Sequence, residues 1–324
     1  MPDTAVVLPE VSASALTPKA VYNGGYANAT EICVRVANGG AGQAGLIGNW
    51  ADAYIQYRVS QGSQPFLVAW YLGDTTESLA FLAEGEVDIA VTYNKAAEDQ
   101  AMRSKSAIRR EYAFRDHFLL AGPTSDPAGL DNITDNEDRV LLMFNQIVSM
   151  GNKDILTPPT DRSAVRFLSR YDKSATNIKE SQIFCEIGQV PWAYAYSKWY
   201  HQYPRFPLEA LSAASLLAEY TLSDHGIWLS SPANVKSNMK IYAIGLDSDS
   251  DADETNPDIL LNPAHILLGA RADEKFKEEC QHFMDWVVSP DGGQKVIREF
   301  KKEGEVLYSE APKAAQRKIQ QRQK

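Results

Sequence analysis

Cysteine is scarce in this chain. Its 324 residues include only Cys33, Cys185 and Cys280, which lie far apart and form no C-x-x-C pair. Disulfide-rich secreted domains and structural zinc sites need more cysteines at closer spacing. The sequence therefore excludes a disulfide framework and a cysteine-based zinc site, and it predicts that the three thiols are buried.

Long apolar runs are missing as well. No stretch approaches the roughly 20 apolar residues that a transmembrane helix needs, and residues 1–20 contain no basic start followed by an apolar run. Such a start is the mark of a signal peptide. As written, the sequence predicts a cytoplasmic protein without a membrane segment, and a signal removed upstream would place it in the periplasm or outside the cell.

Positive charge is in deficit. The 32 Lys and Arg residues are outnumbered by 42 Asp and Glu residues, which gives a formal net charge of −10. A nucleic-acid partner needs a basic face, so none is expected. A small anion stays compatible with this balance, because a pocket depends on local donors.

Hydrolase and metal-site motifs are also absent. G-x-S-x-G and H-E-x-x-H do not occur, and the 5 histidines show no ligand spacing. The acidic run 247–254 imitates a calcium loop, but Ala252 stands where Gly is required and Asp258 where Glu is required. We therefore predict that 247–254 is a solvated loop. For the protein as a whole we predict no metal, no cofactor and no catalytic residue.

What the sequence does contain is a regular alternation of apolar runs and amphipathic segments. Over the first 120 residues this order is typical of β-α-β units around a parallel sheet. The predicted strands are 32–37, 66–72, 87–93 and 112–122, and the predicted helices between them are 45–58, 76–83 and 96–105. A turn at 125–129 then marks a boundary.

The later segments predict a second lobe and a return to the first. The strand pattern at 265–270 and the amphipathic helix 273–288 complete the first lobe, so that two crossings allow hinging around a central cleft. The predicted fold class is α/β, with two Rossmann-like lobes. The predicted divisions are a loose segment 1–30, lobe 1 from 31–122 plus 246–303, lobe 2 from 123–245, and a polar tail 304–324.

Hydroxyls and one guanidinium are concentrated at 169–176, where a short strand pattern turns into a helical one. Arg170 offers a fork of N–H donors to an oxyanion, and the helix that follows points unpaired N–H groups to the same place. The segment therefore indicates an anion site, but ordinary helix capping and an Arg170–Asp172 pair fit it equally well. The candidate hydroxyl donors are Ser169, Ser174 and Thr176.

Two other strand-to-helix turns carry candidate donors. The first is rich in glycine, which lets backbone N–H groups approach an anion; it lacks the G-x-G-x-x-G and P-loop patterns and is also compatible with a simple tight turn. The second offers the hydroxyls of Thr75 and Thr76, which could equally cap a helix. The candidates in the first turn are Asn38, Gly39, Gly40, Ala41 and Gly42.

Two phrases of the sequence resemble the tungstate-binding proteins of bacterial ABC importers, a branch of the periplasmic-binding-protein-like superfamily. The family phrase S-R-G-D-x-S-G-T-x-x-x-E is similar to 169–176 with Glu180, and Y-T-L-T-D-R-G-T-W is similar to 220–228. The resemblance covers roughly residues 31–300. The departures are Tyr171 and Ala175 for glycines, His225 for an arginine, and a glycine-rich first turn where the family has threonine and serine.

The resemblance implies a non-enzymatic binding protein whose two lobes close on a tetrahedral oxyanion similar to tungstate or molybdate. It makes Arg170 the arginine of the site, and with the phrase 220–228 it adds Tyr220 to the ligand-binding candidates. The implied partners of this monomer are the small oxyanion and either a permease or a regulatory protein.

Two other functions stay open at this point. One is an enzyme of the same fold that binds a small organic anion, and the other is an intracellular sensor whose closure is read by a partner protein. Pocket size separates the first from an oxyanion receptor, because an organic ligand needs several hundred cubic ångströms.

Overall fold

The computed structural model of the protein describes residues 16–193, 198–247 and 258–313. Positions 248–254 of the predicted acidic loop lie outside the described residues, as do 1–15 and 314–324 of the predicted terminal segments. Within the described residues, no helix is both long enough and apolar enough to cross a membrane.

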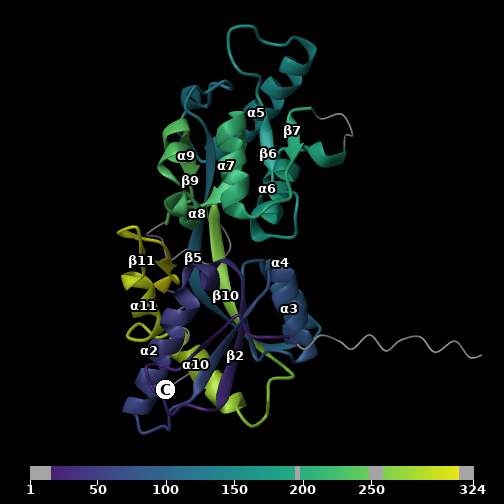
Figure 1. The fold of residues 1–324 in the computed structure, drawn as a ribbon. Coiled ribbons are helices and arrows are strands. Elements are labelled where there is room, and N and C mark those ends of the chain that lie inside the picture. Colours follow the sequence, from purple (N-terminus) through teal and green to yellow (C-terminus); the bar gives the residue numbers. More distant parts are fainter. Residues whose placement is uncertain (1–15, 194–197, 248–257, 314–324) are drawn as a thin grey trace, which may run out of the picture.

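A mixed sheet runs through the whole molecule (Figure 1), in the order β1-β3-β2-β4-β10-β5-β8-β6-β7, with β9 and β13 also paired to β5. Its strands are β1 (Ala20–Tyr22), β2 (Ile32–Asn38), β3 (Leu67–Leu72), β4 (Ile89–Thr92), β5 (Ala107–Pro123), β6 (Phe167–Ser169), β7 (Tyr200–Gln202), β8 (Tyr220–Asp224), β9 (Met239–Ile244), β10 (Leu261–Gly269) and β13 (Ser309–Glu310). A separate small ribbon pairs β11 (Lys301–Lys302) with β12 (Glu305–Val306).

Each half of the sheet contains parallel pairs. In the lower half of Figure 1, β2 is parallel to β3 and β4, and in the upper half β6 is parallel to β7 and β8. The long strand β5 joins the halves, because it pairs with β10 over its first part and with β8 and β9 over its last. The carboxyl ends of the parallel strands are where turns can present ligands.

Helices cover both faces of each half, and apolar side chains fill the space beneath them. In the lower half α2, α10 and α11 bury one cluster and α3 and α4 the other; in the upper half α5 and α6 face α7 and α9 across the sheet. The helices are α1 (Gly40–Ala44), α2 (Leu46–Ser60), α3 (Thr75–Glu84), α4 (Lys95–Arg103), α5 (Arg139–Leu156), α6 (Ala175–Glu186), α7 (Pro207–Leu217), α8 (His225–Ser230), α9 (Ala233–Asn238), α10 (Lys277–Val287) and α11 (Gly293–Glu299). The predicted α/β class is confirmed, and the domain boundaries stay a prediction.

The structure differs from the expectation near both ends of the chain. Residues 20–22, predicted to be loose, form β1 on the edge of β3, and β13 pairs with β5 inside the predicted polar tail. Leu307 and Tyr308 are buried beside it. In both places a few apolar side chains add a short strand to an existing sheet, which needs no periodicity of its own.

Candidate functional site

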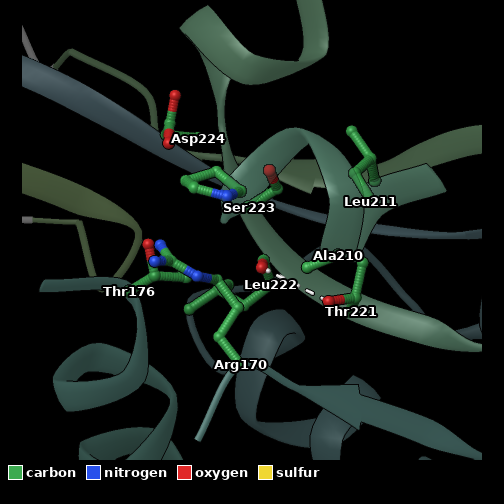
Figure 2. A pocket seen from close by; sticks show the side chains of 9 residues that line it. Arg170, Thr176, Ala210, Leu211, Thr221, Leu222, Ser223 and Asp224 are labelled. Atoms are coloured by element: carbon green, nitrogen blue, oxygen red, sulfur yellow. Dashed lines mark hydrogen bonds between the residues drawn. The ribbon is translucent and has the colours of Figure 1, made fainter. Parts of the chain in front are cut away.

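A hollow lies in the upper half, at the carboxyl end of β8 (Figure 2). The space not occupied by atoms amounts to about 210 Å³, part of it open to solvent. One basic side chain, several hydroxyls and one carboxyl share it with apolar groups from α7. Its lining residues are Arg170, Thr176, Pro207, Ala210, Leu211, Thr221, Leu222, Ser223 and Asp224.

Arg170 is the basic side chain of the hollow. Figure 2 shows its guanidinium beside Thr176, and only 13% of the side chain is exposed. Nη2 donates to Asp172 Oδ2 at 2.5 Å, and Nε makes a long contact of 3.4 Å with the carbonyl of Arg205. Nη1 has no hydrogen-bond partner among the described residues, so the arginine is both paired with Asp172 and able to donate into the hollow.

Ser174 serves the turn itself. Its hydroxyl donates to Asp172 Oδ1 at 2.5 Å and accepts from the backbone amide of Asn177 at 3.3 Å, which caps α6. Asp172 Oδ1 also accepts the backbone amide of Ser174 at 2.9 Å. The capping interpretation therefore describes Ser174, and Asp172 fixes both this cap and Arg170.

Ser169 is likewise turned away from the hollow. It is fully buried, its hydroxyl donates to Glu180 Oε1, and it accepts from the amide of Tyr171 at 3.0 Å and from Asn177 Nδ2 at 3.2 Å. A hydroxyl has one proton and two acceptor positions, so these three contacts use all of its capacity. Thr176 is the predicted hydroxyl of this segment that does line the hollow.

The end of β8 supplies lining residues that the sequence did not single out. Ser223 and Asp224 follow the apolar start of the strand, and Asp224 Oδ1 accepts the amide of Ile227 at 2.9 Å, capping α8. Burial raises the pKa of the Asp224 carboxyl, against the opposing effect of the Arg170 charge. The sequence signal for these two residues is an Asp at the expected start of a helix directly after a short strand, and the phrase 220–228 contains this pattern.

Tyr220 lies elsewhere. Its hydroxyl donates to Asp126 Oδ1 at 2.8 Å and accepts from the amide of Ala128 at 3.0 Å, and its ring is fully buried. It does not line the hollow. Because Asp126 and Ala128 belong to the turn that follows β5, Tyr220 supports that turn from below.

The two turns of the lower half lie next to each other but not in the hollow. The glycine-rich turn forms the short helix α1, and a Cβ added to Gly39 would lie 3.0 Å from the carbonyl oxygen of Gly73 in the second turn. Asn38 is buried and accepts the amide of Gly42 at 2.6 Å. In the second turn Thr75 is buried and Thr76 exposed.

Contacts across the halves bring these turns toward the upper one. Lys173 Nζ lies 4.0 Å from Asp74 Oδ2 and 3.8 Å from Glu77 Oε1, at the start of α3. Beneath them Tyr93 interacts with both sides: burial, Asp116 and Asp224 raise the pKa of its hydroxyl, while Asn38 and the amide of Ala41 lower it. These contacts bring the two turns of the lower half close to the turn that carries Arg170, while Tyr220 lies outside both groups.

Asp116 is a buried carboxyl that interacts electrostatically with Tyr93 and with Asp224. It stands on β5 opposite Asn262 of β10, and Asp224 pairs with Phe118 two positions further along the same strand. Burial raises the pKa of Asp116 well above its ordinary value, and the charge of Asp224 adds to the effect. Two close carboxyls in a dry place retain protons more readily than either would alone.

No arrangement for a metal cation is visible in the described ranges. Residues 16–193, 198–247 and 258–313 contain no group of three or more His, Cys, Asp or Glu side chains placed to hold one.

Comparison with known proteins gives a family match over most of the chain. The model of the PBP superfamily domain matches residues 16–291. A tungstate-binding protein TupA from Peptoclostridium acidaminophilum is 27% identical over 231 residues, which cover 71% of this chain and 69% of that protein. A protein of Haloferax volcanii, provisionally described as an ABC transporter anion-binding protein, is 24% identical over 226 residues. The aligned region covers 69% of this chain and 57% of that protein.

Solved structures agree with this family. A periplasmic protein provisionally described as metal-binding is 46% identical, with a TM-score of 0.79, over 91% of this chain and 99% of that one. The tungstate-binding protein TupA from Desulfovibrio alaskensis G20 is 23% identical, with a TM-score of 0.66, over 87% of this chain and 100% of that one, and this likeness concerns the fold.

Proposed function

The chain belongs to the PBP superfamily, and on that premise we propose that it is a solute-binding protein, not an enzyme, for a small oxyanion of the tungstate or molybdate type. Its curated relatives that carry such names, and its α/β fold, support this proposal. The anion would be held between the two halves, at the hollow beside Arg170.

One observation carries the proposal: Arg170 is fixed in a small hollow with Nη1 free to donate. Asp172 holds one edge of the guanidinium at 2.5 Å, so little rotamer entropy remains to be lost when an anion binds the other edge. Charge-assisted hydrogen bonds of this kind are the strong ones in anion recognition.

The size of the hollow favours an inorganic anion over an organic one. As the halves stand, the hollow has almost no room for the centre of a water-sized sphere, whereas sites for larger organic ligands enclose roughly 300–1,000 Å³. No comparable observation favours an enzyme.

Other residues would complete the site. Thr176 and Ser223 bring hydroxyls into the hollow, and burial raises the pKa of the Asp224 carboxyl, which favours its neutral form and weakens its repulsion of an anion. From the lower half we propose as further donors to the anion the backbone amides of 39–41, since the amide of Gly42 already donates to Asn38. We also propose the hydroxyls of Thr75 and Thr76. Closure of the halves would expel water and strengthen each of these hydrogen bonds.

We further propose that a permease of an ABC importer receives the anion, and that the protein works in the periplasm. The names of the anion-binding relatives and the periplasmic protein at 46% identity support this assignment.

Calorimetric titration with tungstate, molybdate, sulfate and phosphate tests the proposal. We expect one anion to bind tightly and Arg170→Ala to weaken it about 100-fold, because charged hydrogen bonds contribute about 1.5–3 kcal/mol each. Arg166→Ala is the matched control, since Arg166 is half exposed four residues away and should leave the affinity unchanged. Equal binding by the Arg170 variant would reject the site, and no binding of any anion would reject the ligand class.

A further inference from the structure

Glu180 is a fully buried acid beneath the turn that carries Arg170. It lies on α6, and its Oε1 is contacted by the hydroxyl of Ser169, by Asn177 Nδ2 at 2.8 Å and by the hydroxyl of Tyr200 at 3.2 Å. These partners come from β6, α6 and β7 respectively. Three elements of the upper half therefore meet on one carboxyl group.

The second oxygen of this carboxyl is bare. Oε2 is buried and has no hydrogen-bond partner among the residues that the structure describes. An ionised carboxylate with an unsatisfied buried oxygen is costly, and a neutral acid is much less so. Burial raises the pKa of Glu180 to about 8, and the nearby charge of Asp172 acts in the same direction, against the hydrogen bonds from Ser169, Tyr200 and Asn177.

The partners of Glu180 lead directly to the anion site. The Ser169 hydroxyl donates to Glu180 and accepts a hydrogen bond from the backbone amide of Tyr171. Because Arg170 lies between Ser169 and Tyr171 in the chain, this second hydrogen bond fixes the backbone on both sides of Arg170. Tyr171 has a φ of 44°, in the left-handed region, where a side chain is unfavourable. A backbone held in such a conformation needs a fixed partner, and the Ser169 hydroxyl is that partner.

We propose that Glu180 is a positioning residue which, as a neutral acid, holds the 169–174 turn in the conformation that directs Arg170 into the hollow, so that anion binding requires its proton. This inference rests on the proposed function and deepens it by adding a proton to the binding site. Ionisation would place a second negative charge under a turn that Asp172 already makes acidic.

The expected consequence is a loss of anion affinity at alkaline pH. If only the neutral form binds, a pKa of about 8 leaves about one eleventh of the protein competent at pH 9, and the apparent Kd rises about tenfold relative to pH 7. Glu180→Gln keeps a neutral group with the same shape, and it should bind at pH 9 nearly as well as at pH 7.

The experiment is the titration of the wild type and of Glu180→Gln with the best-binding anion among tungstate, molybdate and sulfate between pH 6 and pH 9. These anions do not change protonation in this range, and the ratio of the two Kd values at each pH cancels the titrations that both proteins share, including those of Asp116 and Asp224. Glu186→Gln, an exposed glutamate on the same helix, should follow the wild type. A Glu180→Gln variant that loses affinity in parallel with the wild type would overturn the proposal.

Glu180→Ala tests whether the side chain acts by holding the Ser169 hydroxyl in place. It should weaken binding at every pH by leaving Ser169 without its acceptor, whereas Glu180→Gln rescues binding at pH 7; equal behaviour of the two variants would contradict the proposed role. If none of the anions binds, the proposed function fails while the protonation can still be measured. Infrared spectra of the wild type should then show a protonated-carboxyl band that titrates near pH 8 and is absent from Glu180→Gln, and a wild type without this band overturns the inference.

Discussion

The turn after β2 and the turn after β6 are both proposed to contribute to the anion site, and they are built from different residues. Each follows the end of a strand in a parallel pair and leads into a helix. The lower turn contains four glycines between 39 and 45, and the upper turn, 169–174, contains none. The upper turn nevertheless supplies the arginine of the hollow.

The difference shows what the glycines do. A Cβ on Gly42 would lie 2.3 Å from the indole of Trp70, so this glycine is required for close packing beneath the turn. In the upper turn the backbone is instead held by hydrogen bonds to Asp172 and to Ser169. Glycine density in the lower turn therefore reflects tight backbone packing. In the function that we propose, the anion is bound by the upper turn, where the Asp172 carboxylate fixes Arg170.

The largest effect should come from disturbing the lower turn. We expect Gly42→Ala to lower the free energy of unfolding by about 2 kcal/mol, because overpacking against a rigid neighbour costs about 1–3 kcal/mol. The Trp70 indole cannot move away freely, since its Nε1 donates to the carbonyl of Asn38 at 2.9 Å. Urea unfolding followed by tryptophan fluorescence measures the change.

Gly40→Ala is the matched control within the same turn. A Cβ at this position would meet nothing within 4 Å, and helix α1 gains from alanine, so the variant should be as stable as the wild type or slightly more so. Equal urea midpoints for the Gly42 and Gly40 variants would show that packing is not the reason for the glycine.

The second effect concerns Asp116, the buried carboxyl on β5 that interacts with Asp224. Burial raises the pKa of this carboxyl, so above the ordinary carboxyl pKa the folded protein binds more protons than the unfolded chain does. Its contribution to stability therefore falls as pH rises toward the raised pKa. We expect Asp116→Asn to remove this fall and to be more stable than the wild type at pH 8, by about 1 kcal/mol.

Urea unfolding at pH 4.5, 6 and 8 measures this difference. The two proteins should be closest in stability at pH 4.5 and diverge as the pH rises, because the Asp116 carboxyl titrates only in the wild type. Asp224 and Glu180 are present in both proteins and do not by themselves produce a difference. Stability curves that stay parallel over this range would mean that Asp116 is ionised in the folded protein without a penalty.

Much of the fold could be predicted because its strands are continuous apolar runs or alternate clearly. The strand at 89–92, buried on both faces, is such a run. The start of β10 was missed because Pro263 interrupts its pattern, and proline normally argues against an inner strand. The strand β8 was read only as part of a motif, since its five residues end in Ser-Asp, which is typical of a turn.

The site was predictable in part, for a physical reason. The sequence indicates that Arg170 and Thr176 lie where a strand meets a helix, because this depends on neighbours in the chain. The direction of a side chain depends on distant partners: Tyr220 turns toward Asp126, 94 positions away, and Ser169 toward Glu180. Hydroxyl type alone therefore cannot tell a ligand donor from a residue that supports the turn.

The smallest effect tests the conformation of the upper turn. Tyr171 occupies a φ of 44° with 45% of its surface exposed, so it suffers the left-handed penalty of about 1–2 kcal/mol and gains little from packing. Glycine avoids that penalty but adds about 0.4–1 kcal/mol of entropy to the unfolded chain. We therefore expect Tyr171→Gly to raise the free energy of unfolding by about 0.5 kcal/mol, measured by urea unfolding, and Tyr171→Ala to bring no gain, because alanine meets the same penalty. A stabilised alanine variant would show that the tyrosine side chain, and not the backbone angle, is unfavourable in this turn.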